Sequence, residues 1–141
     1  MNIEKVLPHR KPFLFVEKVT DANYMNYAKG EKVVGDDEFW VEGHFPNNPI
    51  FPGVLILELM AQVGGFIFAN ENSEMPDGKF AYLSKVDGLK LIHKVVPGDL
   101  LEVEAVLVES FMPYHKVKAV TKVKGKKVAE AEITYTFMKN L

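Results

Sequence analysis

Apolar and polar residues alternate along most of the second half of the chain. The alternation is clearest over residues 100–110, 114–124 and 128–138, where Lys, Glu or Thr fall between apolar positions. A period of two is typical of strands with one buried face. Turn-forming residues separate these segments at Pro97-Gly98 and Lys124-Gly125. Hairpins and an antiparallel sheet are therefore expected.

The rest of the chain adds weaker strands to this sheet. Residues 13–20, 24–34 and 79–92 are each predicted to form a strand, which gives about six strands in all. Residues 3–7 are expected to form one helical turn that Pro8 stops. Residues 36–41 are expected to form a short turn.

One helix is predicted, over residues 54–69. Pro52 is tolerated at a helix start, and the residues that follow are apolar nearly all round, which is typical of a buried helix. The pattern therefore predicts an α+β fold in one domain spanning 1–141, with an antiparallel sheet curled around a central helix. The helix face that the sheet leaves uncovered needs a partner, and a second copy of the chain is the simplest one.

Composition adds limits on function. The chain has 141 residues, 48% of them hydrophobic and 26% charged, with a net charge of −2 and no cysteine. No global positive charge suggests nucleic acid, and disulfides, thiol nucleophiles and cysteine metal sites are excluded. The apolar run over 50–69 contains Glu58 and Gln62 and is preceded by prolines, so we do not expect a membrane span.

His44 and Glu58 are the candidate catalytic residues. His44 precedes a loop stiffened by Pro46 and Pro49, and Glu58 is a lone carboxyl group in an apolar helix. An imidazole and a carboxyl group are the parts needed to move protons beside a carbonyl group. The alternatives are a loop histidine that bonds a backbone carbonyl and a structural carboxylate. Their spacing does not place them together, so they meet through a turn or across a subunit boundary.

Other polar groups near His44 and Glu58 have candidate roles as well. Gln62 lies four residues after Glu58, on the same helix face, where it can orient the carboxyl group. Gly53 is either a turn glycine or a backbone N–H donor at a helix N-terminus. Three further histidines, His9, His93 and His115, are expected to be structural or surface residues. No metal-ligand spacing is present, so we expect no metal site.

A row of lysines on one predicted strand has two interpretations. Lys116, Lys118, Lys122 and Lys124 fall on the polar face of residues 114–124. The row is either a solvated strand face or a surface for an acidic protein. Aromatic residues are not interleaved with it, so single-stranded nucleic acid is not expected to bind there.

Several segments resemble a known enzyme family. They are Leu7 to Val16, Gly43-His44-Phe45-Pro46, Pro49 to Glu58, Ala61-Gln62 and Val96-Pro97-Gly98-Asp99. In this order they look like the 3-hydroxyacyl-acyl carrier protein dehydratases of bacterial type II fatty acid synthesis, FabZ type. The resemblance covers essentially the whole chain, and the segment from Gly43 to Gln62 is its most specific part.

The resemblance implies a hotdog fold with its central helix at about residues 53–70. It implies homodimers joined sheet edge to sheet edge, assembled as a homohexamer, with His44 and Glu58 of one site coming from different subunits. Gly53, Gln62, Phe45 and Pro52 are the expected substrate-binding residues. Acyl carrier protein is the expected partner, no cofactor is expected, and the expected location is the cytoplasm.

The activity so implied is dehydration of (3R)-hydroxyacyl-acyl carrier protein to the trans-2-enoyl form. Three alternatives stay open. The first is a dehydratase that also isomerises trans-2 to cis-3 double bonds, the second is a hotdog acyl thioesterase, and the third is a non-catalytic acyl-binding module. A binding module would not need both His44 and Glu58.

Overall fold

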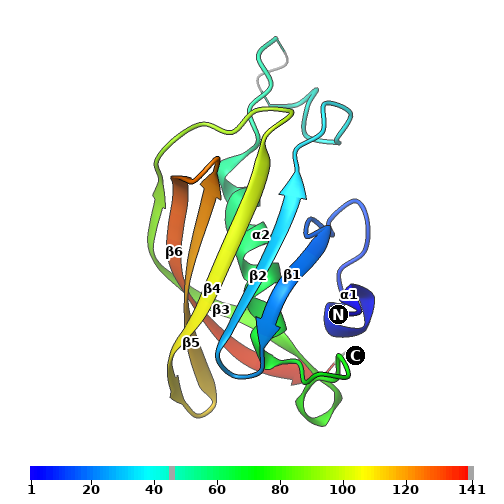
Figure 1. Cartoon of the computed structure of the whole chain (residues 1–141), viewed down its shortest axis with the longest axis vertical. Helices are drawn as coiled ribbons and strands as arrows, with labels where there is room; N and C mark the ends of the chain where they lie inside the picture. Colours follow the sequence, from blue (N-terminus) through cyan, green and yellow to red (C-terminus); the bar gives the residue numbers. More distant parts are fainter. Residues whose placement is uncertain (45–46, 140–141) are drawn as a thin grey trace.

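The computed structural model describes residues 1–44 and 47–139 of the chain. Six antiparallel strands form one sheet in the order β1-β2-β4-β5-β6-β3, and the sheet curls around the helix α2 (Figure 1). The elements in chain order are α1 (Ile3–Val6), β1 (Lys18–Asn23), β2 (Tyr27–Val33), α2 (Gly53–Gly65), η1 (Phe66–Phe68), η2 (Pro76–Gly78), β3 (Lys79–Leu91), β4 (Leu100–Phe111), β5 (Tyr114–Val123) and β6 (Lys126–Lys139). The predicted antiparallel sheet around one long helix is confirmed.

Burial along β4, β5 and β6 follows the predicted alternation. Leu101 and Val103 of β4 and Val117 of β5 are almost fully buried, while residues between them are more exposed. The buried faces of these strands pack against α2. The alternation of apolar and polar residues in the sequence therefore predicts correctly which face of the sheet packs against the helix.

Small residues line the part of the sheet that lies nearest to α2. Four fully buried alanines pair in sequence across neighbouring strands, namely Ala28, Ala105, Ala119 and Ala131. On β2, a Cβ atom added to Gly30 would lie 2.9 Å from the Val63 side chain of the helix. The helix thus packs close to the sheet backbone, and the larger core side chains fill the space beside this row.

The central helix has the expected start but a tighter end. α2 begins at Gly53, and after Gly65 it becomes the 3₁₀ turn η1, in which the Phe66 N–H reaches the Val63 carbonyl. A Cβ atom on Gly64 would collide with the Tyr135 hydroxyl, which donates to the Ala61 carbonyl. In the described residues, no helix has the length and hydropathy needed to span a membrane.

The prediction of a strand over 13–20 is wrong in its first half. β1 begins at Lys18. Upstream, the N–H groups of Phe15 and Val16 donate to the Gln62 side chain at 2.8 and 3.2 Å. Because a helix side chain takes up these donors, the segment cannot use them in a strand ladder.

The prediction over 24–34 is also too long at its start. β2 begins at Tyr27, after a turn in which Met25 has a positive φ of 57°. The Met25 N–H donates to the Ile67 carbonyl at 2.7 Å. The turn between β1 and β2 is therefore tied to the segment that follows α2, and these residues are not extended.

His115 is a buried titratable residue in β5. Its ring packs against Phe68 and Phe137, with centroid distances of 5.3 and 5.0 Å, and its Nδ1 lies 2.9 Å from the Ser110 hydroxyl. Burial lowers the pKa of His115 below its ordinary value of 6.5. The folded protein therefore holds a neutral imidazole there at pH values where the unfolded chain takes up a proton.

This pKa shift predicts a loss of stability in mild acid. As the pH falls below about 6.5, the unfolded chain binds a proton that folded His115 does not bind, so the free energy of unfolding falls. His115→Phe should lose less stability than wild type between pH 7.5 and pH 5.5, measured by urea unfolding. Ser110→Ala, which keeps the histidine, should retain the wild-type pH dependence. Equal pH dependence in His115→Phe and wild type would contradict the assignment.

Candidate active site

Glu58 lies on the side of α2 that the sheet leaves uncovered. The next two residues, Leu59 and Met60, point to other sides of the helix and are fully buried. The uncovered side carries Val54, which is 68% exposed, and Glu58, whose side chain is 23% exposed. The position follows from the helical period, because residues 54, 58 and 61 share one face. Glu58 is therefore a partly exposed carboxyl group on a helix face that also carries Gln62.

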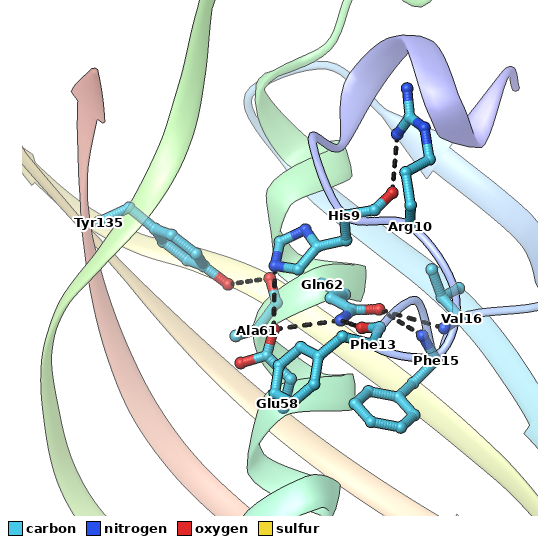
Figure 2. Close-up of polar contacts among 9 residues, drawn as sticks. All are labelled: His9, Arg10, Phe13, Phe15, Val16, Glu58, Ala61, Gln62 and Tyr135. Atoms are coloured by element: carbon cyan, nitrogen blue, oxygen red, sulfur yellow. Dashed lines mark hydrogen bonds and ion pairs between the residues drawn. The ribbon is translucent and has the colours of Figure 1, made fainter. Parts of the chain in front are cut away.

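Two nitrogen atoms converge on one oxygen of Glu58 (Figure 2). The Nε2 of His9 lies 3.0 Å from Glu58 Oε1, and the Nε2 of Gln62 donates to the same oxygen at 3.1 Å. The expectation that Gln62 contacts the Glu58 carboxyl group is confirmed. Its contact with substrate stays a prediction.

Gln62 is held by more than Glu58. It is only 1% exposed, and its Oε1 accepts the N–H groups of Phe15 and Val16, while its Nε2 also donates to the Phe13 carbonyl at 2.8 Å. Together with the bond to Glu58, these contacts use both acceptor and both donor positions of the amide. The Gln62 amide therefore has one possible orientation, and it presents an N–H to Glu58.

His9 reaches Glu58 from the segment between α1 and β1. The neighbouring Arg10 side chain ties this segment together, since its Nη1 donates to the carbonyls of Leu7 and His9 at 2.9 and 2.7 Å. The sequence predicts a structural or surface role for His9, and the pattern around it does not reveal this contact with Glu58. The signal that points to it is its place in Leu7-Pro8-His9-Arg10, the first segment of the family resemblance.

His44 lies in the segment that leads into α2. Its backbone N–H donates to the Trp40 carbonyl at 3.0 Å, and its ring Nδ1 lies 2.8 Å from the Ile50 carbonyl oxygen. Because a carbonyl only accepts, this contact assigns a hydrogen to Nδ1. In the neutral ring, Nε2 then carries the lone pair that a general base needs. The bond to a backbone carbonyl that we considered as a structural role is thus compatible with a catalytic role.

A buried ion pair supports the segment that carries His44. Lys32 of β2 is 5% exposed, and its Nζ lies 3.1 Å from Glu38 Oε1, which also accepts the Trp40 indole N–H at 3.1 Å. The Trp40 ring packs edge-on against Phe51 at 5.3 Å, and the Phe51 N–H donates to the Val95 carbonyl. The chain on both sides of His44 is therefore fixed to the core.

Gly53 and Pro52 stand where α2 begins. The Pro52 carbonyl accepts the N–H groups of Leu55 and Ile56, as expected of a residue at the helix N-cap. A Cβ atom on Gly53 would collide with the methyl groups of Leu91, an exposed side chain that would have to shift to accommodate it. Phe45, the remaining expected binding residue, lies outside the described residues.

The described contacts form two groups. Glu58, Gln62 and His9 meet midway along α2, whereas His44, Pro52 and Gly53 gather at its start. Glu58 lies about 7.5 Å further along the helix axis than Gly53, at 1.5 Å per residue. Within the described residues, no group of three acidic, histidine or cysteine side chains has the arrangement of a metal site.

Tyr135 approaches the Glu58 group from β6. Burial raises the pKa of Tyr135, and the charge of Glu58 raises it further. Its hydroxyl donates to the Ala61 carbonyl at 2.7 Å. Tyr135 therefore remains a phenol and supports the helix, and it is not a candidate base.

Comparisons with known proteins show the family to which this sequence is similar. Residues 7–132 match the family described as FabA-like domain. The "3-hydroxyacyl-[acyl-carrier-protein] dehydratase FabZ" of Clostridium botulinum (strain Loch Maree / Type A3) is 42% identical over 138 residues, covering 98% of this chain and 94% of that protein. The protein of the same name from Clostridium novyi (strain NT) is 38% identical over 134 residues, covering 95% and 93%.

A solved structure shares the architecture. A chain of "The Dehydratase Heterocomplex ApeI:P from Xenorhabdus doucetiae" matches with a TM-score of 0.81 and 15% sequence identity, covering 99% of this chain and 93% of that chain. At this identity the likeness establishes the fold alone. The sheet wrapped around α2 is thus the hotdog fold that the sequence resemblance implies.

Proposed function

Because the chain belongs to the FabA-like domain family, which matches residues 7–132, we propose that it is a 3-hydroxyacyl-acyl carrier protein dehydratase. It removes water from a (3R)-hydroxyacyl thioester on acyl carrier protein and leaves the trans-2-enoyl thioester, a step of fatty acid biosynthesis. The observation that carries the proposal is the Glu58 carboxyl group, held at one oxygen on the uncovered face of α2. The cytoplasmic location in this proposal rests on the family resemblance.

Three groups divide the chemistry. The Gly53 N–H, at the positive end of α2, donates to the thioester carbonyl and stabilises the enolate-like charge, an effect worth roughly 3 kcal/mol for such a donor. Neutral His44 takes the C2 proton through Nε2. Glu58 gives a proton to the 3-hydroxyl group, the C3–O bond breaks and water leaves. Each proton transfer assisted in this way contributes about 10²–10⁴-fold.

The reaction is redox-neutral. Two proton transfers and the departure of water convert substrate into product, so the proposed chemistry calls for no redox cofactor. The pantetheine arm that presents the acyl chain belongs to the carrier protein and arrives with the substrate.

The edge strand β3 is the proposed dimer contact. It pairs with β6 on one side only, and Tyr82 and Leu91 on it are 59% and 52% exposed. A second copy paired along β3 would continue the sheet and cover this edge. The Leu91 side chain packs over Gly53, so a partner on β3 would also lie beside the start of α2.

Such a dimer would combine the two groups of site residues. In the proposal, His44 of one subunit works with Glu58 of the partner subunit, which accounts for their separate contacts within one chain. Three such dimers form the proposed hexamer, an expectation that the family resemblance supports.

The carrier protein needs a surface near this site. The lysine row predicted on β5 faces carboxylates, since Lys118 lies 3.4 Å from Glu130 and Lys122 pairs with Glu102 across the strands. That arrangement favours the solvated strand face over an acidic-protein surface.

A second group of lysines, which shares Lys124 with that row, lies near the segment that leads into α2. Lys94, Lys124 and Lys126, with His93 and Asp99, line a hollow of about 380 Å³ between the loop before β4 and the β5–β6 turn. The Val95 carbonyl of this loop accepts the N–H of Phe51, two residues before α2 begins. We therefore assign carrier-protein docking to this hollow, because acyl carrier proteins are acidic and a thioester delivered there arrives close to Gly53.

The first test of the function is direct. Purified protein incubated with 3-hydroxyacyl thioesters on carrier protein should convert them to enoyl thioesters, seen by mass spectrometry as the loss of one water. His44→Ala and Glu58→Gln should abolish the conversion while remaining folded by circular dichroism, because each removes one proton-transfer group. Free acid as product would identify a thioesterase, and unchanged bound acyl chains a binding module. The double-bond position of the product tests isomerisation.

Mixing the two inactive variants tests the shared site. When His44→Ala and Glu58→Gln subunits are refolded together in equal amounts, half of the dimers are mixed and each holds one intact site. About a quarter of wild-type turnover should return if the site spans two subunits. If no activity returns although mixed dimers form, His44 and Glu58 act within one chain.

Charge reversal tests the docking surface. Lys124→Glu with Lys126→Glu should raise KM for the carrier-bound substrate about tenfold at low salt with kcat unchanged, because steering by opposite charge is lost. The matched pair Lys116→Glu and Lys118→Glu should change KM much less. The reverse order of effects would move docking to the β5 face.

A further inference from the structure

His9 contacts Glu58 directly, and neither the family resemblance nor the proposed mechanism gives it a role. Building on the proposed dehydratase function, we infer that His9 is a positioning residue that, together with Gln62, directs the transferable proton of Glu58 to Oε2. The two donor atoms lie 3.0 and 3.1 Å from Oε1. Figure 2 shows the second carboxyl oxygen turned away from both donors.

The Gln62 amide settles which atom faces Glu58. Two backbone N–H groups, those of Phe15 and Val16, point at one end of the amide, so that end is the oxygen. The opposite end must then be the NH₂ group, which bonds the Phe13 carbonyl and Glu58 Oε1. Glu58 Oε1 therefore accepts an N–H hydrogen of Gln62, and an amide flip that would put the Gln62 oxygen there is ruled out.

The His9 ring has one arrangement that fits this neighbour. Its Nδ1 is buried and has no hydrogen-bond partner among the described residues. A hydrogen on Nδ1 would leave a buried donor unsatisfied and would turn the Nε2 lone pair toward an oxygen that is already an acceptor. The hydrogen thus belongs on Nε2, and His9 donates to Glu58 Oε1.

Two donors on Oε1 decide where the acid carries its proton. A hydrogen on Oε1 would compete with the hydrogens from His9 and Gln62, so protonated Glu58 carries its hydrogen on Oε2. When that proton passes to the 3-hydroxyl group and water leaves, the carboxylate keeps both hydrogen bonds, which then become charge-assisted. His9 therefore orients the acid and stabilises it after the transfer, without touching the substrate.

The backbone around His9 is built to keep this contact. Arg10 bonds the carbonyls of Leu7 and His9, and its Nε lies 3.0 Å from the Glu4 carboxylate. The segment is therefore closed on itself by a side chain that points away from Glu58 (Figure 2). The support for His9 is separate from the support for Gln62, so the two donors can be tested one at a time.

The test replaces His9 and measures turnover against binding. His9→Leu should lower kcat on carrier-bound substrate about 10- to 100-fold with little change in KM, since one charge-assisted hydrogen bond is lost and substrate contacts are not. His9→Gln, whose amide N–H can reach the position of Nε2, should recover most of the lost kcat. A purely structural role would not depend on this N–H. If His9→Leu and His9→Gln have equal kcat, or if both keep wild-type kcat, the inference is wrong.

A matched control separates positioning from stability. Asn2→Ala removes the cap that accepts the Lys5 N–H at the start of α1, so it loosens the same N-terminal segment without touching Glu58. It should keep wild-type kcat. If Asn2→Ala lowers kcat as much as His9→Leu at equal loss of unfolding free energy, the effect of His9 is structural. Should His9→Leu not fold, the comparison of His9→Gln with His9→Asn, whose amide is too short for Glu58, decides in the same way.

The outcomes also keep this inference apart from the proposed function. If wild-type protein makes no enoyl thioester, the dehydratase proposal fails first. If wild type dehydrates and His44→Ala does not, but His9→Leu retains wild-type kcat, the function stands and the role of His9 is refuted.

Discussion

The structure depends on burying one helix that is apolar almost all round. A single sheet covers three sides of α2, and the row of small residues from Ala28 to Ala131 lets the two pack closely. On the fourth side, the segment 7–16 covers the second half of the helix, where Leu7 lies against Gly65 and Gln62 bonds Phe13 and Phe15. The first half keeps Val54 exposed and Glu58 partly exposed, which favours contact with a partner and makes the carboxyl group reachable by substrate. The same constraint therefore calls for a partner subunit and creates the place for the site.

Gln62 turns that place into a defined geometry. Its buried amide joins α2 to the segment 13–16 and fixes the Glu58 carboxyl group with its last N–H. Because the backbone N–H groups of this segment bond Gln62, they do not pair with a neighbouring strand, and β1 starts only at Lys18. His9 reaches Glu58 from residues upstream of this segment, which Arg10 holds through the carbonyls of Leu7 and His9. The segment 13–16, which has no regular secondary structure, is thus ordered by the Gln62 side chain of α2.

The His44 half of the site is held by an ion pair and by aromatic packing. His44 depends on a loop pinned by the buried Lys32–Glu38 pair and by the packing of Trp40 on Phe51. Loss of the Glu38 contact would leave the buried Lys32 charge with only the Glu17 carboxylate, at 3.8 Å, so the pair favours one loop conformation. Since the two halves have separate supports, acid and base can be oriented independently. Their meeting then becomes a matter of subunit assembly in the proposed dimer.

Much of this was readable from the sequence, for a local reason. Alternation predicts which residues of β4 to β6 face inward, and the helical period places Gln62 and Glu58 on one face, because both periods act over a few residues. The sequence itself indicates His44 and Glu58 as candidate catalytic residues, and the family resemblance adds the expectation that they come from different subunits. The tertiary structure alone decided that β3 pairs with β6, that residues 13–17 are not strand, and that His9 bonds a carboxyl group 49 positions away. Such contacts join residues far apart in the sequence and depend on the path of the whole chain, so they cannot be predicted from the spacing of neighbouring residues.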